Sequence, residues 1–200
     1  LIFSFALPLI LGNLGQQLYM ITDTVIVGQG VGLDALASLG ATDWIYWLVL
    51  WPVQFLTQGF AVLITQNIGE GNEKSIRKSI TMSAVLCLVI GALVSILFPM
   101  FAKPLLYLLK TPADIFDGAH SYVTVMYLGT LIVMAYSMAS AVLRAFGDGK
   151  TPLIGMIIAA VLNIGLDLLL VMGFKWGIVG AAIATIFSQF VAFSYCLYMI

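Results

Sequence analysis

The chain has 200 residues, of which 62% are hydrophobic and 8% are charged, and its mean hydropathy is +1.11. Because a soluble domain carries about 25% charged residues, this composition excludes a soluble globular protein and predicts an integral membrane protein. Eight lysines and arginines nearly balance nine acids, which leaves no basic surface large enough to bind nucleic acid along its phosphate backbone.

Apolar segments fill most of the chain, and short clusters of charged residues separate them. Each segment is long enough to cross a hydrocarbon core about 30 Å thick. Period-2 alternation is absent and the segments are too long for barrel strands, so we expect helices. We predict an all-α membrane protein, a six-helix bundle forming one unit over residues 1–200. The expected spans are approximately residues 2–30, 44–69, 76–98, 115–143, 152–174 and 177–200.

The first expected span contains two residues that are unusual in a transmembrane helix. Pro8 leaves one backbone hydrogen bond unmade and predicts a kink, which is either a static bend or one that shifts with ion binding. Asp23 is the only charged residue in its segment. An acid at bilayer depth costs about 2.5–3.5 kcal/mol on insertion scales, so Asp23 is expected to pair, bind a cation or carry protons.

The connections between spans predict the orientation in the membrane. The first connection, expected near residues 33–43, has no lysine or arginine, and all the connections on its side of the membrane together carry three lysines. By the positive-inside rule the second and fourth connections, and with them the N-terminus, are cytoplasmic in a multi-pass protein of the plasma (inner) membrane. The cations of these two connections are Lys74, Arg77, Lys78, Arg144 and Lys150.

Two amides, Gln54 and Gln58, lie in the second expected span. They either line a substrate cleft or hydrogen-bond between helices, because amides serve both purposes in membrane proteins. The two cysteines, Cys87 and Cys196, lie inside apolar helices without C-x-x-C spacing, and we interpret them as packing residues.

A second isolated acid, Asp167, lies in the fifth expected span. Asp23 stands seven residues before Gly30, and Asp167 stands eight residues before Lys175. At 1.5 Å per residue, both acids are expected roughly 10–12 Å below the outer surface. The two carboxylates therefore share one predicted level.

Three further polar residues are expected in the same outer half of the membrane. Asn163 is one helical turn from Asp167 on the same face, Thr185 lies in the sixth span and Tyr122 in the fourth. One interpretation is a hydrogen-bonded structural layer that joins four helices. The other is a cation or proton site, because oxygen-rich and sulfur-free ligands suit hard ions such as Na⁺. If the ion is Na⁺, the expected ligands are Asp23, Asn163, Asp167 and Thr185.

Two other interpretations fail on their motifs. The segment Gly147-Asp-Gly-Lys-Thr resembles the end of a P-loop, but Arg144 stands where that motif requires glycine, and no strand precedes it. An intramembrane aspartyl protease would need a G-x-G-D signature, whereas Ile164-Gly-Leu precedes Asp167. We therefore expect no enzyme activity and no cofactor.

Three stretches resemble the multidrug and toxin extrusion (MATE) transporters: residues 20–28 with 33–37, residues 65–72, and residues 143–152 continuing into 163–167. The resemblance implies a lobe that is one half of a twelve-helix transporter, here the N-terminal one. A second six-helix lobe, in the same full-length chain or in another copy, is then an expected partner.

The resemblance also implies a function. It is the export of small organic, often cationic compounds by alternating access, coupled to inward flow of H⁺ or Na⁺. Asp23, Asn163, Asp167 and Thr185 match positions that the family uses for cation coupling, and Tyr122 matches another. A lipid-linked precursor flippase of the same superfamily is an alternative, although it would need a cationic cleft. A non-transporting membrane scaffold or half-size subunit is a further one.

Overall fold

A computed structural model describes residues 14, 15, 17 and 20–200 of the chain. Helices account for most of the described residues, and no strand occurs among them. The prediction of an all-α membrane protein is therefore confirmed. The helices are a first one described over residues 20–30, then α2 (Leu33–Gly69), α3 (Glu73–Leu108), α4 (Ala113–Leu128), α5 (Thr130–Ala145), α6 (Lys150–Asp167), the π-helix η1 (Leu168–Gly173) and α7 (Gly177–Met199).

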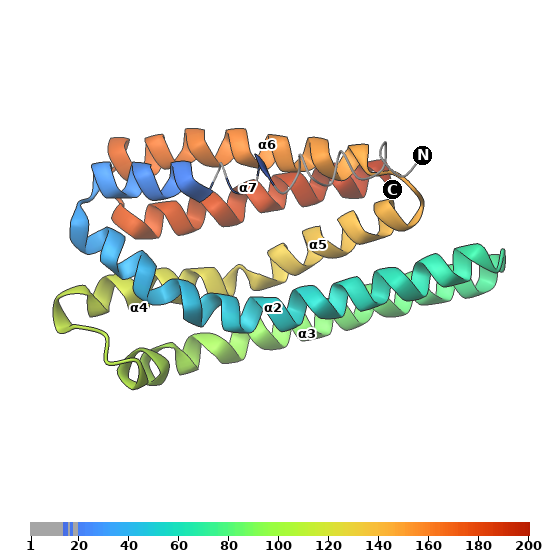
Figure 1. Ribbon diagram of the computed structural model, residues 1–200, viewed down its shortest axis with the longest axis horizontal. Coiled ribbons are helices and arrows are strands. Elements are labelled where there is room, and N and C mark those ends of the chain that lie inside the picture. Colours follow the sequence, from blue (N-terminus) through green and yellow to red (C-terminus); the bar gives the residue numbers. More distant parts are fainter. Residues whose placement is uncertain (1–13, 16, 18–19) are drawn as a thin grey trace.

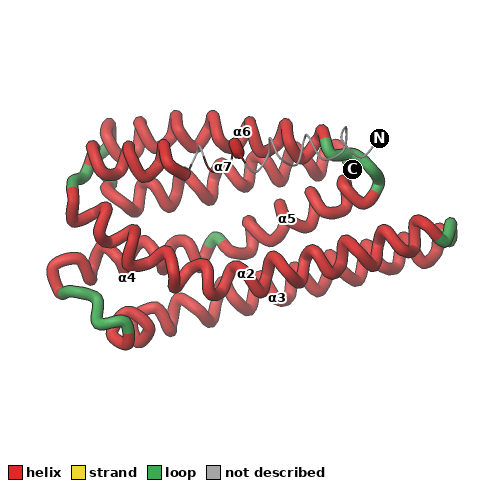
Figure 2. The backbone as a smooth tube through the Cα atoms, in the orientation of Figure 1, coloured by secondary structure: helices red, strands yellow, loops and turns green. Residues whose placement is uncertain are grey.

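The helices run back and forth along the long axis of the molecule (Figure 1). On one side α6 packs along α7, and on the other α2 packs along α3. The pair α4 and α5 lies between these two layers and contacts both, as the tube in Figure 2 also shows. Most contacts between the two layers therefore involve this pair, and α2 also contacts α7 directly.

Four described helical segments are long and apolar enough to cross a membrane: α2, α3, α6 with η1, and α7. The consecutive helices α4 and α5 form a fifth if they are counted as one bent span. Most of the expected first span, including Pro8, lies outside the described residues, so its kink stays a prediction.

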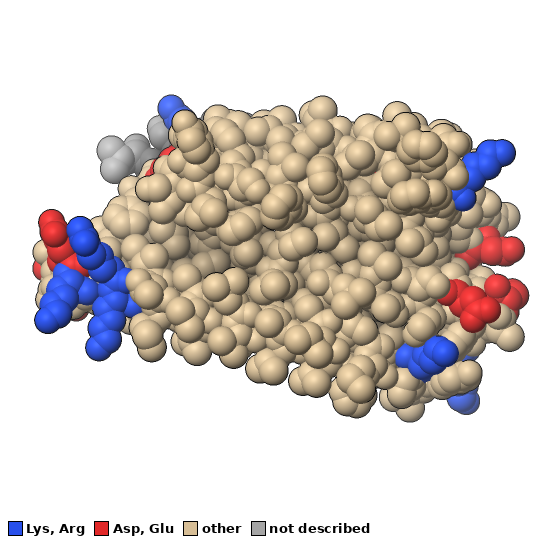
Figure 3. Space-filling view, turned by 180° about the vertical axis from the view of Figure 1, so that it is seen from behind, with Lys and Arg blue, Asp and Glu red and all other residues tan. Residues whose placement is uncertain are grey.

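The surface agrees with a membrane environment. Lysines, arginines and acids gather at the two ends of the molecule, and the face between them in Figure 3 shows none. Large apolar side chains of this middle region are exposed, among them Leu48, Phe55 and Ile96. A hydrocarbon core is the solvent in which such a surface is stable.

The expected connection over residues 33–43 is helical, which corrects the predicted start of the second span. The helix α2 begins at Leu33, and only residues 31 and 32 separate it from the first helix. Gly32 has a φ of 117°, a conformation that glycine adopts without steric cost. The segment is rich in leucine and alanine and lacks proline, so it favours helix despite its two acids.

The expected fourth span consists of two helices, α4 and α5, which are separated by Gly129 and bent by 44° relative to each other. The side chain of Ile186 on α7 occupies the space where a Cβ at position 129 would stand. Beyond the break, the Leu131 backbone N–H donates to the Ser95 hydroxyl on α3 at 3.0 Å. The neighbouring helices thus stabilise the bend by packing and by satisfying a backbone donor.

Candidate ion site

Asp167 is the last residue of α6 and has no exposed surface. Asn163, one turn earlier on the same face, is 1% exposed. Both side chains are buried because α6 packs along α7 over most of its length. The apolar sequence that makes α6 a membrane helix therefore holds a carboxyl and an amide inside the protein.

Asp23 lies on the first helix, where it is half-buried and its Oδ1 atom is inaccessible. Its carboxyl group interacts with that of Asp167 on α6. One turn on, Ile26 and Val27 are buried in the same apolar core as Val171, which follows Asp167 by four residues. The two acid-bearing helices therefore share one apolar core a turn beyond the carboxyl groups.

Thr185 connects this site to α7. The Asn163 Nδ2 atom donates a hydrogen bond to the Thr185 Oγ1 atom at 3.3 Å, and both residues are buried. The amide and the hydroxyl that the sequence places in this layer thus meet in the structure.

Oxygen acceptors without donors are the most distinctive chemical feature of the site. With neither carboxyl group protonated, no hydrogen-bond donor among the described residues reaches four buried oxygens: Oδ1 of Asp23, Oδ1 of Asn163, and both Oδ1 and Oδ2 of Asp167. A buried acceptor left unpaired costs about 1–3 kcal/mol, and more if it is charged. Because an ionised carboxylate only accepts, a proton or a cation is what such a group of atoms lacks.

Hard cations fit this donor set, since all of its atoms are oxygens of the kind that Na⁺ and related ions prefer. Within the described part of the chain, no group of three or more His, Cys, Asp or Glu side chains could hold a metal ion. A Na⁺ ion here would therefore depend on the amide and hydroxyl oxygens as well as on the two carboxylates.

The remaining predicted residues fall in different places. Tyr122 on α4 is buried in the same core as Ile26. Gln58 on α2 is exposed and Gln54 is half-buried, and α2 does not contact α6 within the described structure. Neither glutamine therefore lies on a helix that contacts the helix of Asp167, and their role as cleft residues stays a prediction.

Sequence analysis missed one acid near the site. Asp43 on α2 acts electrostatically on Asp23, although it was expected in a loop outside the membrane. The helical propensity of residues 33–43 could have placed Asp43 correctly, because these residues form the first turns of α2 rather than a loop.

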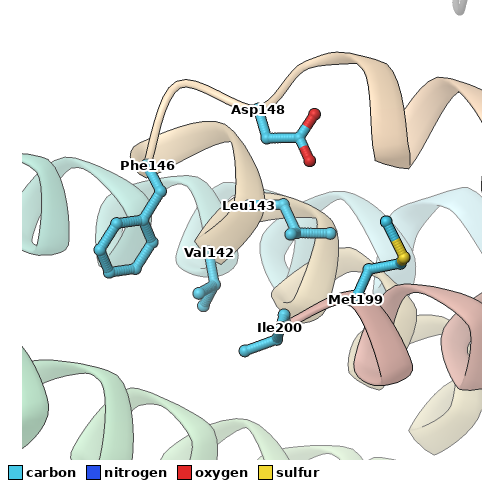
Figure 4. A pocket seen from close by; sticks show the side chains of 6 residues that line it. All are labelled: Val142, Leu143, Phe146, Asp148, Met199 and Ile200. Carbon is cyan, nitrogen blue, oxygen red and sulfur yellow. The ribbon is translucent and has the colours of Figure 1, made fainter.

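A pocket of about 290 Å³ lies at the other end of the bundle, where α5 leads into α6 (Figure 4). Its one charged residue is Asp148, whose Oδ1 accepts from the backbone N–H groups of Lys150 and Thr151, each at 3.0 Å. That carboxylate caps the start of α6, so the pocket does not provide a second candidate ion site like the one at Asp23 and Asp167. Its lining residues are Val142, Leu143, Phe146, Asp148, Met199 and Ile200.

Long apolar helices that bring two interacting acids together between them indicate a multi-pass membrane protein and are typical of the transporter class. The model of the MatE family matches residues 8–169. The chain belongs to this family, which confirms the resemblance seen in the sequence. Since the family is one of transporters, the prediction that the chain is not an enzyme also holds.

Similar proteins extend this result. The probable multidrug resistance protein YpnP of Bacillus subtilis is 34% identical over 198 residues, which cover 98% of this chain and 44% of YpnP. The probable multidrug resistance protein NorM of Thermotoga maritima is 29% identical over 201 aligned residues, covering 98% of this chain and 43% of NorM.

A solved structure shows the same fold. It is the outward-facing conformation of a multidrug resistance MATE family transporter of the MOP superfamily, with a TM-score of 0.91 and 25% sequence identity. The match covers 97% of this chain and 43% of that one. The chain thus spans less than half the length of the proteins it matches, which agrees with one lobe of a two-lobe transporter.

Proposed function

We propose that the protein containing this chain is a secondary active antiporter that exports small organic, often cationic compounds and is driven by inward flow of H⁺ or Na⁺. The observation that carries the proposal is the interacting Asp23–Asp167 pair beside Asn163, with buried oxygen atoms that lack donors. Membership of the MatE family and the names of the similar multidrug resistance proteins support export.

The proposed ligands of the coupling ion are side-chain oxygens of this chain. The carboxylates of Asp23 and Asp167, the Asn163 amide oxygen and the Thr185 hydroxyl would hold Na⁺, or the two carboxylates would carry protons in its place. Asn163 donates to Thr185 and leaves its own oxygen open toward an ion. Tyr122, buried in the adjoining core, belongs to this proposed layer on α4.

Transport requires that the ion bind with different affinity in two conformations, because an ion that binds both equally shifts nothing. Ion loading from outside would favour substrate release and return to an inward-facing state. A fully buried Asp167 supports such a cycle, since it has no surface open to an ion in this conformation. This is alternating access, with the cleft completed by a second six-helix lobe.

We also propose that the N-terminus is cytoplasmic and that the membrane is the plasma membrane. The α2–α3 turn and the α5–α6 turn lie at one end of the bundle (Figure 1). The connections that precede α2, join α3 to α4 and precede α7 lie at the opposite end. Lys74, Arg77 and Lys78 follow the first of these turns, and Arg144 and Lys150 flank the second. This distribution supports a cytoplasmic position for that end by the positive-inside rule.

The flippase alternative receives no support from the site. A pyrophosphate group needs cationic partners, whereas the described layer contains carboxylates, an amide and a hydroxyl. A non-transporting scaffold would not require interacting acids at membrane depth, which cost free energy to bury.

Efflux from proteoliposomes tests the proposed function. The complete encoded protein is reconstituted, and export of a fluorescent organic cation is followed under an imposed H⁺ gradient and, separately, a Na⁺ gradient. Efflux under one gradient, lost in Asp167→Asn and kept in Asp34→Asn, is the expected result. Asp34 is a suitable control because it is an exposed acid in the first turn of α2. Equal efflux by wild type and Asp167→Asn would contradict the proposal.

A further inference from the structure

The helix that carries Asp167 changes its hydrogen-bond pattern directly after that residue. The segment Leu168–Gly173 is a π-helix, in which Phe174 N–H donates to the Leu169 carbonyl at 2.8 Å, five residues back. Such turns hold one more residue than an α-helical turn and are frequently found at functional sites. Here the turn begins at the residue next to the buried carboxyl group.

The first helix contacts this turn through a glycine. A Cβ atom at Gly30 would stand 3.1 Å from Val171 Cγ1 and 3.2 Å from Met172 Cγ. Val171 is 1% exposed and belongs to the main core, so it has little room to move. The helix of Asp23 therefore meets the helix of Asp167 at two levels: at the carboxyl groups and, seven residues further along, at Gly30.

The extra residue of the π-turn sets the rotation of Asp167. Each residue of an α-helix turns the chain by roughly 100°, whereas a π-turn holds one more residue and so turns less per residue. The four residues from Asp167 to Val171 therefore place the carboxyl group on a different face than they would in an α-helix. With Val171 fixed in the core, the π-turn determines which face of α6 presents Asp167. That face is the one on which the Asp23 carboxyl group lies.

We propose that the π-turn Leu168–Gly173, packed against Gly30, is the positioning element that turns Asp167 toward Asp23. The inference rests on the proposed ion site and goes beyond it, because it makes Gly30 a positioning residue although Gly30 touches no ion. The charged groups that act on the pair from neighbouring elements include Asp43 on α2, which acts on Asp23.

The test measures how strongly the two carboxyl groups interact. In the complete protein in lipid, a hydrophobic carbodiimide modifies Asp167 when it is protonated, and mass spectrometry gives the labelled fraction against pH. The interaction is the change in labelling midpoint that Asp23→Asn causes. It is expected to be about one pH unit or more, the size that defines coupled titration. Gly30→Ala is expected to reduce that change by more than half.

Gly28→Ala is the matched control. It lies on the same helix, and its Cβ would meet only Leu36 methyl groups at 3.9 Å, an ordinary contact. It is expected to leave the midpoint change as in wild type. A Gly30→Ala protein with the full wild-type change would overturn the proposal, and so would an equal loss in both variants.

Labelling and efflux separate this inference from the proposed function. Ion-driven efflux by wild type together with an unaffected midpoint change in Gly30→Ala would sink the inference alone. A midpoint change that depends on Gly30 in a protein that exports nothing under either gradient would sink the proposed function and leave the positioning role intact.

Discussion

Asn163 on α6 and Thr185 on α7 form one buried hydrogen bond, with the Asn163 Nδ2 atom donating to Thr185 Oγ1 at 3.3 Å. Because Asn163 lies one turn from Asp167, this bond connects the proposed ion site to the neighbouring helix. It also directs the two polar side chains of this layer toward each other rather than toward lipid.

Thr185→Val should disrupt this layer with little change in side-chain shape. It leaves the Asn163 Nδ2 donor unpaired in a buried site, which costs about 1–3 kcal/mol of stability. We expect a lower thermal unfolding midpoint in detergent and a smaller increase of that midpoint when the coupling ion is added. Thr185→Ser keeps the hydroxyl and should stay near wild type. Identical melting curves for the valine and serine variants would show that the bond contributes nothing.

The α5–α6 turn provides a prediction for pH. Asp148 lies between these helices, and hydrogen bonds from the Thr151 side chain and then from backbone N–H groups lower the pKa of its carboxyl group below the ordinary 3.8. A lowered folded-state pKa stabilises the protein above the unfolded-state pKa, and this contribution is lost as the pH falls through the folded-state value.

Asp148→Ala should therefore reduce stability at neutral pH, by about 0.5–2 kcal/mol, the usual cost of removing a helix cap. The difference from wild type should shrink as the pH drops below 3.8. Asp148→Asn keeps an acceptor oxygen and should retain most of the cap. Unfolding midpoints recorded from neutral pH to below 3.8 check this, and a difference that grows in acid would contradict it.

The bend between α4 and α5 predicts a compensating pair of substitutions. Gly129→Ala places a methyl group where the Ile186 side chain lies, and such overpacking costs about 1–3 kcal/mol. Ile186→Ala makes room, so the double variant should be more stable than the sum of the single effects predicts. The control is Gly59→Ala, whose Cβ would meet nothing within 4 Å. Additive unfolding free energies would show that the two positions do not interact.

Local periodicity and charge predicted much of this fold. Apolar segments between charge clusters gave the helical class, and counting back from Gly30 and Lys175 put Asp23 and Asp167 at one level. The structure brings these two carboxyl groups together because their helices pack side by side beyond that level, at Gly30 and Val171. Their function as an ion site stays a prediction.

What the sequence did not reveal depends on contacts between distant segments. The break at Gly129 is stabilised by Ile186 and Ser95, which are far away along the chain. Hydropathy averages over such a bend, since the residues around it are mostly apolar. The π-turn after Asp167 is equally invisible, because its residues Leu168–Gly173 suit an α-helix as well. Asp43 was missed for a different reason, since its charge and that of Asp34 were interpreted as marking a connection, although the residues between them favour helix.

Substrate-driven ion movement is the most direct test of ion coupling at Asp23 and Asp167. Proteoliposomes containing the complete protein, with no ion gradient imposed, are given a gradient of an organic cation, and internal pH and Na⁺ are recorded with indicator dyes. Antiport predicts that substrate moving one way drives H⁺ or Na⁺ the other way, and that Asp23→Asn and Asp167→Asn abolish this movement while Asp34→Asn keeps it. Substrate flux that moves neither ion, or ion movement that persists in both site variants, would contradict the account.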